Sequence, residues 1–257
     1  MLQSAQKKFI SLLSKIDYTK RLFEVFNDFC ILGTYSLALP FYKDLASKEL
    51  EKVYARYTRE QLIKFDEMFT VMVEGMEIHN GDFLGEIFGE CEFRNDRQGQ
   101  FFTPYNVSLM IAKMTFSGCK EQIERNGFIT MNEPASGSGG MVIAFRQVMI
   151  DEQCNPSRDV FVVTQDISEL AFMMCYIQCS LYGLAAEVVH GNTLSMEIWR
   201  VLKTPVYFIT DWRLRLALKD LSEFTRSLGI SGSKQEETMT RSETEDRLPG
   251  STQLDLF

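Results

Sequence analysis

The chain has 257 residues, enough for one large domain or two small ones. Apolar residues make up 45% of it, as a globular core requires, and the formal net charge is −8. This charge excludes a generic basic protein that coats DNA, so any DNA contact must use a local patch or a partner.

The six cysteines include no CxxC pair. We therefore expect reduced thiols in a cytoplasmic protein rather than a disulfide scaffold. Cys175 and Cys179 lie one helical turn apart and could share a metal, but no second pair accompanies them. Two buried thiols are the favoured interpretation, and no metal site is predicted. We expect no signal peptide, because no compact apolar core with a small-residue cleavage site follows Lys7 and Lys8, and no apolar run is long enough to span a bilayer.

The first part of the chain, residues 1–97, is predicted to be a helical domain. Apolar residues keep helical spacing from Phe9 to Ile16. The segment Thr58–Gln61 has the pattern of a capping box and opens a long amphipathic helix. Asp82 is expected to cap the next helix, from Phe83 to Phe88.

A polar loop then leads into Gly99-Gln100-Phe101-Phe102-Thr103-Pro104. Pro104 is expected to start a helix, because proline is favoured in the first turn. Four apolar residues share one face of that helix: Val107, Met110, Ile111 and Met114. In a purely structural interpretation, Phe101 and Phe102 anchor the core.

The next feature is a glycine-rich turn, Glu133-Pro134-Ala135-Ser136-Gly137-Ser138-Gly139-Gly140. A predicted strand, Phe128 to Met131, precedes it, and a predicted helix, Met141 to Phe145, follows it. This order brings backbone N–H groups close to a nucleotide-like ligand, and glycine is needed because a Cβ would block the approach. A glycine turn by itself is weak evidence, since many serve only tight strand–helix packing.

Together the two segments resemble the S-adenosylmethionine-binding motifs of N6-adenine DNA methyltransferases, especially the modification subunits of type I restriction systems. The resemblance covers about residues 80–210. The family forms are GQFFTP or GQFYTP, then Asp-Pro-x-x-Gly-(Ser/Thr)-Gly-Gly, and Glu133 stands where Asp is usual. The resemblance implies an α/β fold with a partial Rossmann-like methyltransferase sheet at 98–228, S-adenosylmethionine as cofactor and DNA as substrate. It assigns to cofactor binding Phe101, Phe102, Thr103, Pro104, Glu133, Ala135, Gly137, Ser138, Gly139 and Gly140.

A second buried strand is predicted at Val160 to Val163, with Asp166 three residues beyond it. An acidic side chain at this place can accept both ribose hydroxyls of a nucleoside. The family usually has Gly-Gln-Glu here, and the change to Asp166 keeps the carboxylate. Asp166 is also expected to cap the following helix, whose segment from Leu170 to Leu181 is apolar nearly all round.

A third strand, Ala186 to Val189, is expected to end in His190-Gly191-Asn192-Thr193-Leu194. The family often has Gly-Asp-(Ser/Thr)-Leu there, with the Asp accepting a hydrogen bond from the adenine amino group of the cofactor. Asn192 can still accept that hydrogen bond through its carbonyl oxygen, although it lacks the charge.

The catalytic motif of the family is Asn/Asp/Ser-Pro-Pro-aromatic after a further strand, where it binds the flipped adenine. Here the predicted strand Val206 to Ile209 is followed by Asp211 and Trp212, without a Pro-Pro pair. Asp211 and Trp212 are therefore catalytic candidates by position and chemistry. Alternatively, Trp212 is a core residue at a strand–helix turn.

Only one amphipathic helix, about residues 214–228, is predicted after the last strand, so the chain resembles the cofactor-binding half of a methyltransferase. Three interpretations stay open. The chain is an active DNA methyltransferase, a catalytically inactive accessory protein of replication or anti-restriction, or half of a split enzyme that a specificity or complementing subunit completes.

The last segment, residues 229–257, is rich in Ser, Thr, Glu, Arg and Gly and is predicted to be disordered. It ends in Gln253-Leu254-Asp255-Leu256-Phe257, which resembles the pentapeptide that binds the bacterial sliding clamp, Gln-Leu-(Ser/Asp)-Leu-Phe. Three apolar side chains can fill a groove while Gln253 fixes the register. The resemblance implies the clamp as a partner.

Overall fold

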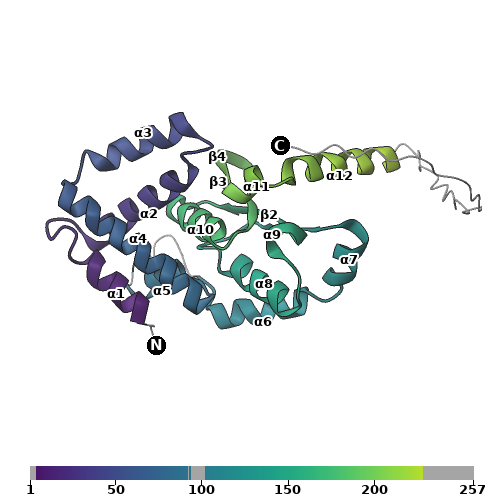
Figure 1. Cartoon of the computed structure of the whole chain (residues 1–257), viewed down its shortest axis with the longest axis horizontal. Coiled ribbons are helices and arrows are strands. Elements are labelled where there is room, and N and C mark those ends of the chain that lie inside the picture. The colour runs from purple at the N-terminus through teal and green to yellow at the C-terminus, as the bar shows by residue number, and fades with distance from the viewer. Residues whose placement is uncertain (1–3, 92, 94–101, 228–257) are drawn as a thin grey trace, which may run out of the picture. The chain divides into compact units, whose positions relative to one another are not determined.

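The structure is a computed structural model that describes residues 4–91, 93 and 102–227 (Figure 1). Gly99 to Phe101 and the pentapeptide from Gln253 to Phe257 lie outside the described residues. Met1–Leu216 form one compact unit and Ala217–Phe257 another. No helix among the described residues is both long and apolar enough to cross a membrane.

The first part of the chain is helical, as predicted. Its elements are α1 (Ser4–Leu13), α2 (Leu22–Ala38), α3 (Lys43–Tyr54), α4 (Arg59–His79) and α5 (Phe83–Glu90). The capping box of α4 is confirmed, because the Thr58 hydroxyl accepts from the Gln61 N–H and the Gln61 side chain accepts from the Thr58 N–H. Asp82 caps α5 by accepting a hydrogen bond from the Gly85 N–H at 2.9 Å.

The second part combines a sheet with helices and confirms the predicted α/β class. Its strands are β1 (Ile129–Glu133), β2 (Val160–Asp166), β3 (Ala185–Asn192) and β4 (Glu197–Lys203). Its helices are α6 (Tyr105–Thr115), α7 (Cys119–Asn126), α8 (Gly140–Asp151), α9 (Pro156–Asp159), α10 (Glu169–Leu181), α11 (Pro205–Ile209) and α12 (Trp212–Ser227).

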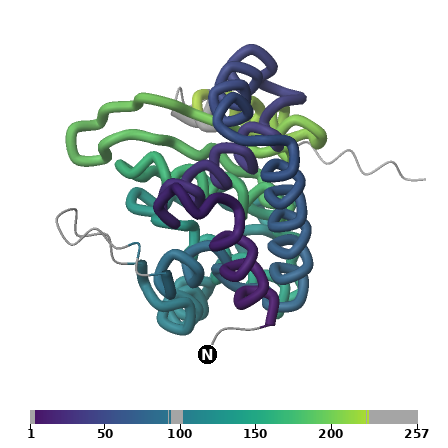
Figure 2. Tube along the Cα trace, turned by 90° about the vertical axis from the view of Figure 1, so that its left-hand side faces the viewer, coloured from purple at the N-terminus to yellow at the C-terminus, as the bar shows by residue number. Residues whose placement is uncertain are grey.

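The strands lie in the order β1-β2-β3-β4, with β1, β2 and β3 parallel and β4 antiparallel to β3. The parallel register places Glu133 beside Thr164 and Asp166 beside His190. The carboxyl ends of β1, β2 and β3 therefore meet at one edge of the sheet. Figure 2 shows the hairpin of β3 and β4 projecting beyond the neighbouring helices.

Helix α10 joins the sheet to the N-terminal helices (Figure 1). Every residue from Leu170 to Cys179 is buried, as the nearly uniform apolar sequence predicts. The Thr34 hydroxyl of α2 donates to the carbonyl of Met173, and the Leu84 N–H of α5 donates to the side-chain oxygen of Gln178. One hydrophobic core consequently extends from α1 to β4.

The predicted boundary between residues 97 and 98 falls in a segment outside the described residues. Residues on both sides of this boundary contribute to the same core. The division into a helical domain, 1–97, and a cofactor-binding domain, 98–228, stays a prediction.

The strand predicted at Val206 to Ile209 is wrong, because these residues belong to α11. Pro205 occupies its first turn, where the fixed φ of proline favours a helix. A short apolar run does not distinguish strand from helix by its periodicity. The fourth strand is β4, which the sequence reading missed because most of its side chains are not buried.

The apolar face predicted for α6 is largely exposed, since only Ile111 of its four residues is half-buried. Met110 and Met114 are 58% and 72% exposed. The buried residues of α6 are instead Ser108 and Ala112. Their small side chains suit the close packing of α6 on α8.

Candidate functional site

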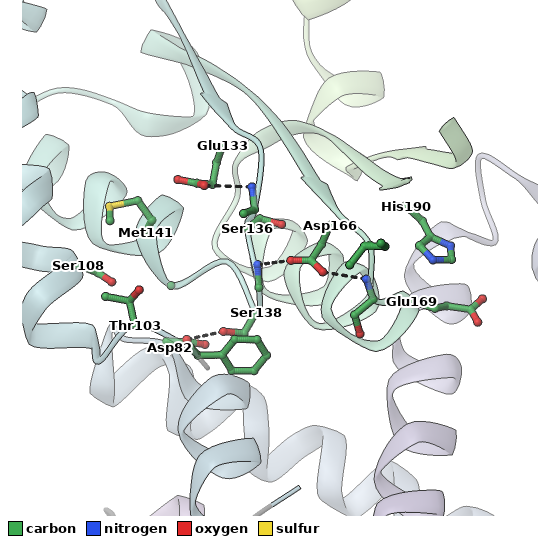
Figure 3. A pocket seen from close by; sticks show the side chains of 16 residues that line it. Asp82, Thr103, Ser108, Glu133, Ser136, Ser138, Met141, Asp166, Glu169 and His190 are labelled. Atoms are coloured by element: carbon green, nitrogen blue, oxygen red, sulfur yellow. Dashed lines mark hydrogen bonds between the residues drawn. The ribbon is translucent and has the colours of Figure 1, made fainter. Parts of the chain in front are cut away.

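A cavity of about 750 Å³ lies at the carboxyl ends of β1, β2 and β3 (Figure 3). Loop residues before α6 and the first turns of α8 and α10 complete its wall. The cavity is lined by Asp82, Phe102, Thr103, Ser108, Glu133, Ala135, Ser136, Gly137, Ser138, Gly140, Met141, Asp166, Ile167, Ser168, Glu169 and His190.

The glycine turn packs closely against neighbouring side chains. Gly137 and Gly139 have positive φ values of 54° and 96°, a region that other residues rarely adopt. A Cβ on Gly137 would lie 2.7 Å from a ring carbon of Phe102, and one on Gly139 would lie 3.2 Å from Cys175 Sγ. The turn therefore requires glycine both for its backbone conformation and for its contacts.

Asp166 stands at the end of β2 and fixes the glycine turn. Its Oδ2 accepts a hydrogen bond from the Gly137 N–H, and its Oδ1 accepts one from the Ser168 N–H, both at 2.8 Å. The predicted capping role belongs instead to Ser168, whose hydroxyl accepts from the Ala171 N–H. One carboxylate thus connects two loops and also faces the cavity.

Asp82 connects the N-terminal helices to the same turn. Besides capping α5, its carboxylate accepts hydrogen bonds from the Ser138 hydroxyl at 2.5 Å and from the Gln178 amide at 2.8 Å. Burial raises the pKa of the Asp82 carboxyl, and these hydrogen bonds only partly oppose that effect. A Cβ on Gly140 would lie 2.8 Å from Asp82 Oδ2, so Gly140 packs closely against the Asp82 carboxylate.

The charge of the cavity is one-sided. Four carboxyl groups line it, those of Asp82, Glu133, Asp166 and Glu169, and no lysine or arginine is among its described lining residues. Arg200 lies behind Glu169, with its guanidinium donating at 2.8 Å. The cavity consequently favours a ligand with positive charge.

Two buried hydroxyl groups mark the cavity as a place where polar partners belong. Among the described residues, four buried side-chain N or O atoms have no hydrogen-bond partner, and Ser108 Oγ and Ser136 Oγ are two of them. Both serines line the cavity. Because buried polar groups are normally satisfied, the cavity fits a polar ligand.

Most residues that the sequence assigned to cofactor binding line this cavity: Phe102, Thr103, Glu133, Ala135, Gly137, Ser138, Gly140 and Asp166. Gly139 lies in the glycine turn and packs against Cys175 of α10. Pro104 lines a smaller adjoining pocket together with Thr103. Asn192 is not among the lining residues, because its side-chain oxygen accepts from the N–H groups of Leu194 and Ser195 within its own turn. Phe101 lies outside the described residues.

Sequence reasoning missed several lining residues. Asp82 was identified only as a helix cap, and Ser108 was not singled out on its helix. His190 was given no role, yet it lies beside Asp166 in the sheet and packs edge-on against Trp199, with ring centroids 4.9 Å apart. The only available signal for His190 was its place at the end of a predicted strand.

Asp211 and Trp212, the catalytic candidates, are not among the residues that line the cavity. Trp212 is completely buried between Phe128 and Phe161, at the amino ends of β1 and β2. Its ring N–H donates to the Ser157 carbonyl at 2.8 Å. Trp212 is thus the core residue of the alternative interpretation, and no face of its ring is open to a base.

One further segment has a proline and an aromatic residue after a strand, Thr204-Pro205-Val206-Tyr207. Because β4 runs antiparallel, its end lies at the amino end of β3, opposite the cavity. The Thr204 hydroxyl donates to the Leu184 carbonyl there. This segment therefore does not face the cavity either.

The described residues contain no group of three His, Cys, Asp or Glu side chains arranged to hold a metal ion. Cys175 and Cys179 are both buried, with their sulfur atoms 3.9 Å apart. Both residues lie on the buried helix α10, which is consistent with a role in core packing.

Comparison of the chain with known proteins identifies its family. The family model for N-6 DNA methylases matches residues 82–211, just over half of the chain. No curated protein matches the chain. A solved structure from Listeria monocytogenes, described as a class I S-adenosylmethionine-dependent methyltransferase, is similar at 12% identity and a TM-score of 0.38. The match covers 75% of this chain but only 55% of that one. On the family match, the chain belongs to the N-6 DNA methylase family.

Proposed function

We propose that the chain binds S-adenosylmethionine in the glycine-turn cavity and takes part in N6 methylation of adenine in DNA. The main support is that one cavity combines a glycine turn, the Asp166 carboxylate at the end of β2 and an acidic lining. Family membership supports methyl transfer as the reaction class.

The lining charge separates this ligand from other nucleotides. S-adenosylmethionine has a sulfonium and an ammonium group, whereas ATP and NAD bring negatively charged phosphates. Phosphate next to Glu133 and Asp166 would be repelled, and no described lysine or arginine of the lining offsets that repulsion. A cationic adenosine derivative fits the same surroundings.

Different lining residues would contact different parts of S-adenosylmethionine. An ionised carboxylate offers about four lone-pair sites, so Asp166 can accept both ribose hydroxyls while keeping its two backbone hydrogen bonds. Phe102 and Thr103 would cover the methionine end. When bound, S-adenosylmethionine supplies the electrophilic methyl group.

Catalysis requires more than these residues offer. The 257 residues contain no Pro-Pro pair, and Asp211 and Trp212 do not line the cavity. We therefore propose that the chain alone transfers methyl groups weakly or not at all, and that a complementing or specificity subunit supplies the adenine-binding motif. The rival function is a catalytically inactive accessory protein of replication or anti-restriction that uses the same scaffold. Methylation assays with and without candidate partner chains separate the two.

Recruitment to replicating DNA by the sliding clamp is the second part of the proposal. It rests on the sequence Gln253-Leu254-Asp255-Leu256-Phe257, which lies outside the described residues. An apolar cluster at the end of a polar segment is typical of a short peptide that docks in a groove. A cytoplasmic location would follow.

Calorimetric titration of the purified chain with S-adenosylmethionine and, separately, with ATP tests the central proposal. We expect saturable binding of S-adenosylmethionine and no measurable binding of ATP. Binding of ATP with the higher affinity, or no binding of S-adenosylmethionine by a folded protein, would overturn it.

A further inference from the structure

Ser108 has an unusual place in the cavity wall. It lies on α6, is 0% exposed, and its hydroxyl has no hydrogen-bond partner. In Figure 3 it lies beside Thr103, at the end of the cavity away from Asp166, Glu169 and His190. A buried hydroxyl without a partner loses its hydration and gains nothing in return, so it calls for an explanation.

The usual helix acceptor for this hydroxyl is already occupied. A serine inside a helix commonly donates to the carbonyl four residues earlier, which here belongs to Pro104. That carbonyl already accepts from the Val107 N–H at 2.9 Å and from the Ser108 N–H at 3.1 Å. Because a carbonyl oxygen has two lone pairs, no acceptor site is left for the side chain.

We propose that Ser108 Oγ donates a hydrogen bond to the α-carboxylate of S-adenosylmethionine and thereby makes the site selective for that group. This inference rests on the proposed function. With the ribose on Asp166, the amino-acid end of the ligand would extend toward the other end of the cavity, where Ser108 lies. The carboxylate is the one anionic group of the ligand, and the described lining offers it no lysine or arginine. Hydroxyl groups, backbone N–H groups of the glycine turn and the amino ends of α6 and α8 are favourable partners for it, and Ser108 Oγ is a hydroxyl among them that is buried without a partner.

A ligand can contact the Ser108 hydroxyl only if neighbouring side chains move. Water does not reach Ser108 Oγ in the structure, so a ligand atom reaches it only when neighbouring side chains shift. Thr103 and Met141 line the same end of the cavity. Methionine adapts easily because it has three rotatable bonds and no branch.

The test compares Ser108→Ala with Ser180→Ala as a matched control. Ser180 also lies on a helix, but its hydroxyl donates to the Tyr176 carbonyl and does not line the cavity. Each protein is titrated calorimetrically with S-adenosylmethionine and with decarboxylated S-adenosylmethionine, which keeps the sulfonium and amine but lacks the carboxylate. Thermal unfolding is recorded without ligand.

We expect Ser108→Ala to weaken binding of S-adenosylmethionine about tenfold, a typical effect of one hydrogen bond to a charged group. Binding of the decarboxylated ligand should not change. Without ligand, Ser108→Ala should raise the unfolding temperature, since it removes a buried unsatisfied hydroxyl. Ser180→Ala should bind both ligands like the wild type and gain no stability.

The outcomes separate this inference from the proposed function. If the wild type does not bind S-adenosylmethionine, the proposed function fails. If the wild type binds it and Ser108→Ala binds it equally well, only the role of Ser108 fails. Equal weakening for both ligands would also overturn that role, because Ser108 would then shape the cavity rather than recognise the carboxylate.

Discussion

At the scale of single residues, Gly137 is constrained both by its positive φ and by the Phe102 ring close to it, and two glycine variants can separate these effects. Gly137→Ala introduces a positive-φ penalty and a Cβ 2.7 Å from the Phe102 ring. Gly118→Ala, at φ 78°, has the same kind of penalty, but nothing lies within 4 Å of its Cβ. We expect each variant to lose about 1–2 kcal/mol of stability from the backbone.

Only Gly137→Ala should also weaken S-adenosylmethionine binding, by about tenfold or more, since it displaces Phe102 from the cavity wall. Urea unfolding and calorimetry measure the two effects. Equal binding by both variants would show that the turn does not form the ligand site.

Asp82 gives a prediction about pH. Because burial raises its pKa above the ordinary 3.8, the folded protein binds this proton more tightly than the unfolded chain does. Its contribution to stability is therefore fully present below pH 3.8 and is lost as the pH rises through the raised value. Asp82→Asn is neutral and nearly isosteric, so it lacks this loss.

We expect the unfolding free energy of the wild type, relative to Asp82→Asn, to fall as the pH rises above 3.8. Asp82→Ala should lose about 2–4 kcal/mol at low pH, because it leaves the Ser138, Gln178 and Gly85 donors unpaired, and less as the pH rises. Urea titrations across the pH range provide the comparison, and a constant difference between wild type and Asp82→Asn would contradict the assignment.

At the scale of secondary-structure elements, α11 and the first turn of α12 pack at the amino end of the sheet rather than at its ligand-binding edge. Trp212→Phe should lose about 1–2 kcal/mol, because it removes ring volume and the hydrogen bond to Ser157. S-adenosylmethionine binding should stay unchanged. A variant with normal stability but abolished DNA methylation, assayed with partner chains, would restore Trp212 as a base-stacking residue.

The elements that sequence patterns predicted well are those with strong local signals. The capping box at Thr58, the glycine turn after β1 and the uniformly apolar α10 are each set by residues close together in the chain. Asp166 was found for the same reason, as the carboxylate three residues after an apolar run. Weak signals failed, as at Val206 to Ile209, where a four-residue apolar run forms a helix.

The missed parts of the site depend on tertiary contacts. Asp82 and Ser138 are 56 residues apart in sequence and meet only because α5 packs against the glycine turn. Ser108 became notable only once its neighbours were known, since a serine in a helix is ordinary by itself. Trp212 shows the converse, because its place after an apolar run suggested a catalytic role that its burial does not support.

At the scale of the whole molecule, we expect cofactor binding and recruitment to be independent properties of the chain. The double variant Leu256→Ala, Phe257→Ala should lose binding to the sliding clamp, because it removes two of three apolar anchors, while S-adenosylmethionine binding stays unchanged. Fluorescence anisotropy with a peptide covering residues 248–257 measures the clamp contact, which we expect to be about micromolar. A wild-type peptide that binds no better than the double variant would remove the link to replication.

The central claim, that the glycine-turn cavity is the S-adenosylmethionine site, is tested most directly by a crystal structure of the chain grown with saturating S-adenosylmethionine. The account predicts ligand density in this cavity, with both ribose hydroxyls on Asp166, the ligand passing over Gly137, and the carboxylate beside Ser108. Density for the ligand at another place, or an ordered cavity without ligand at a concentration that saturates binding in solution, would contradict it.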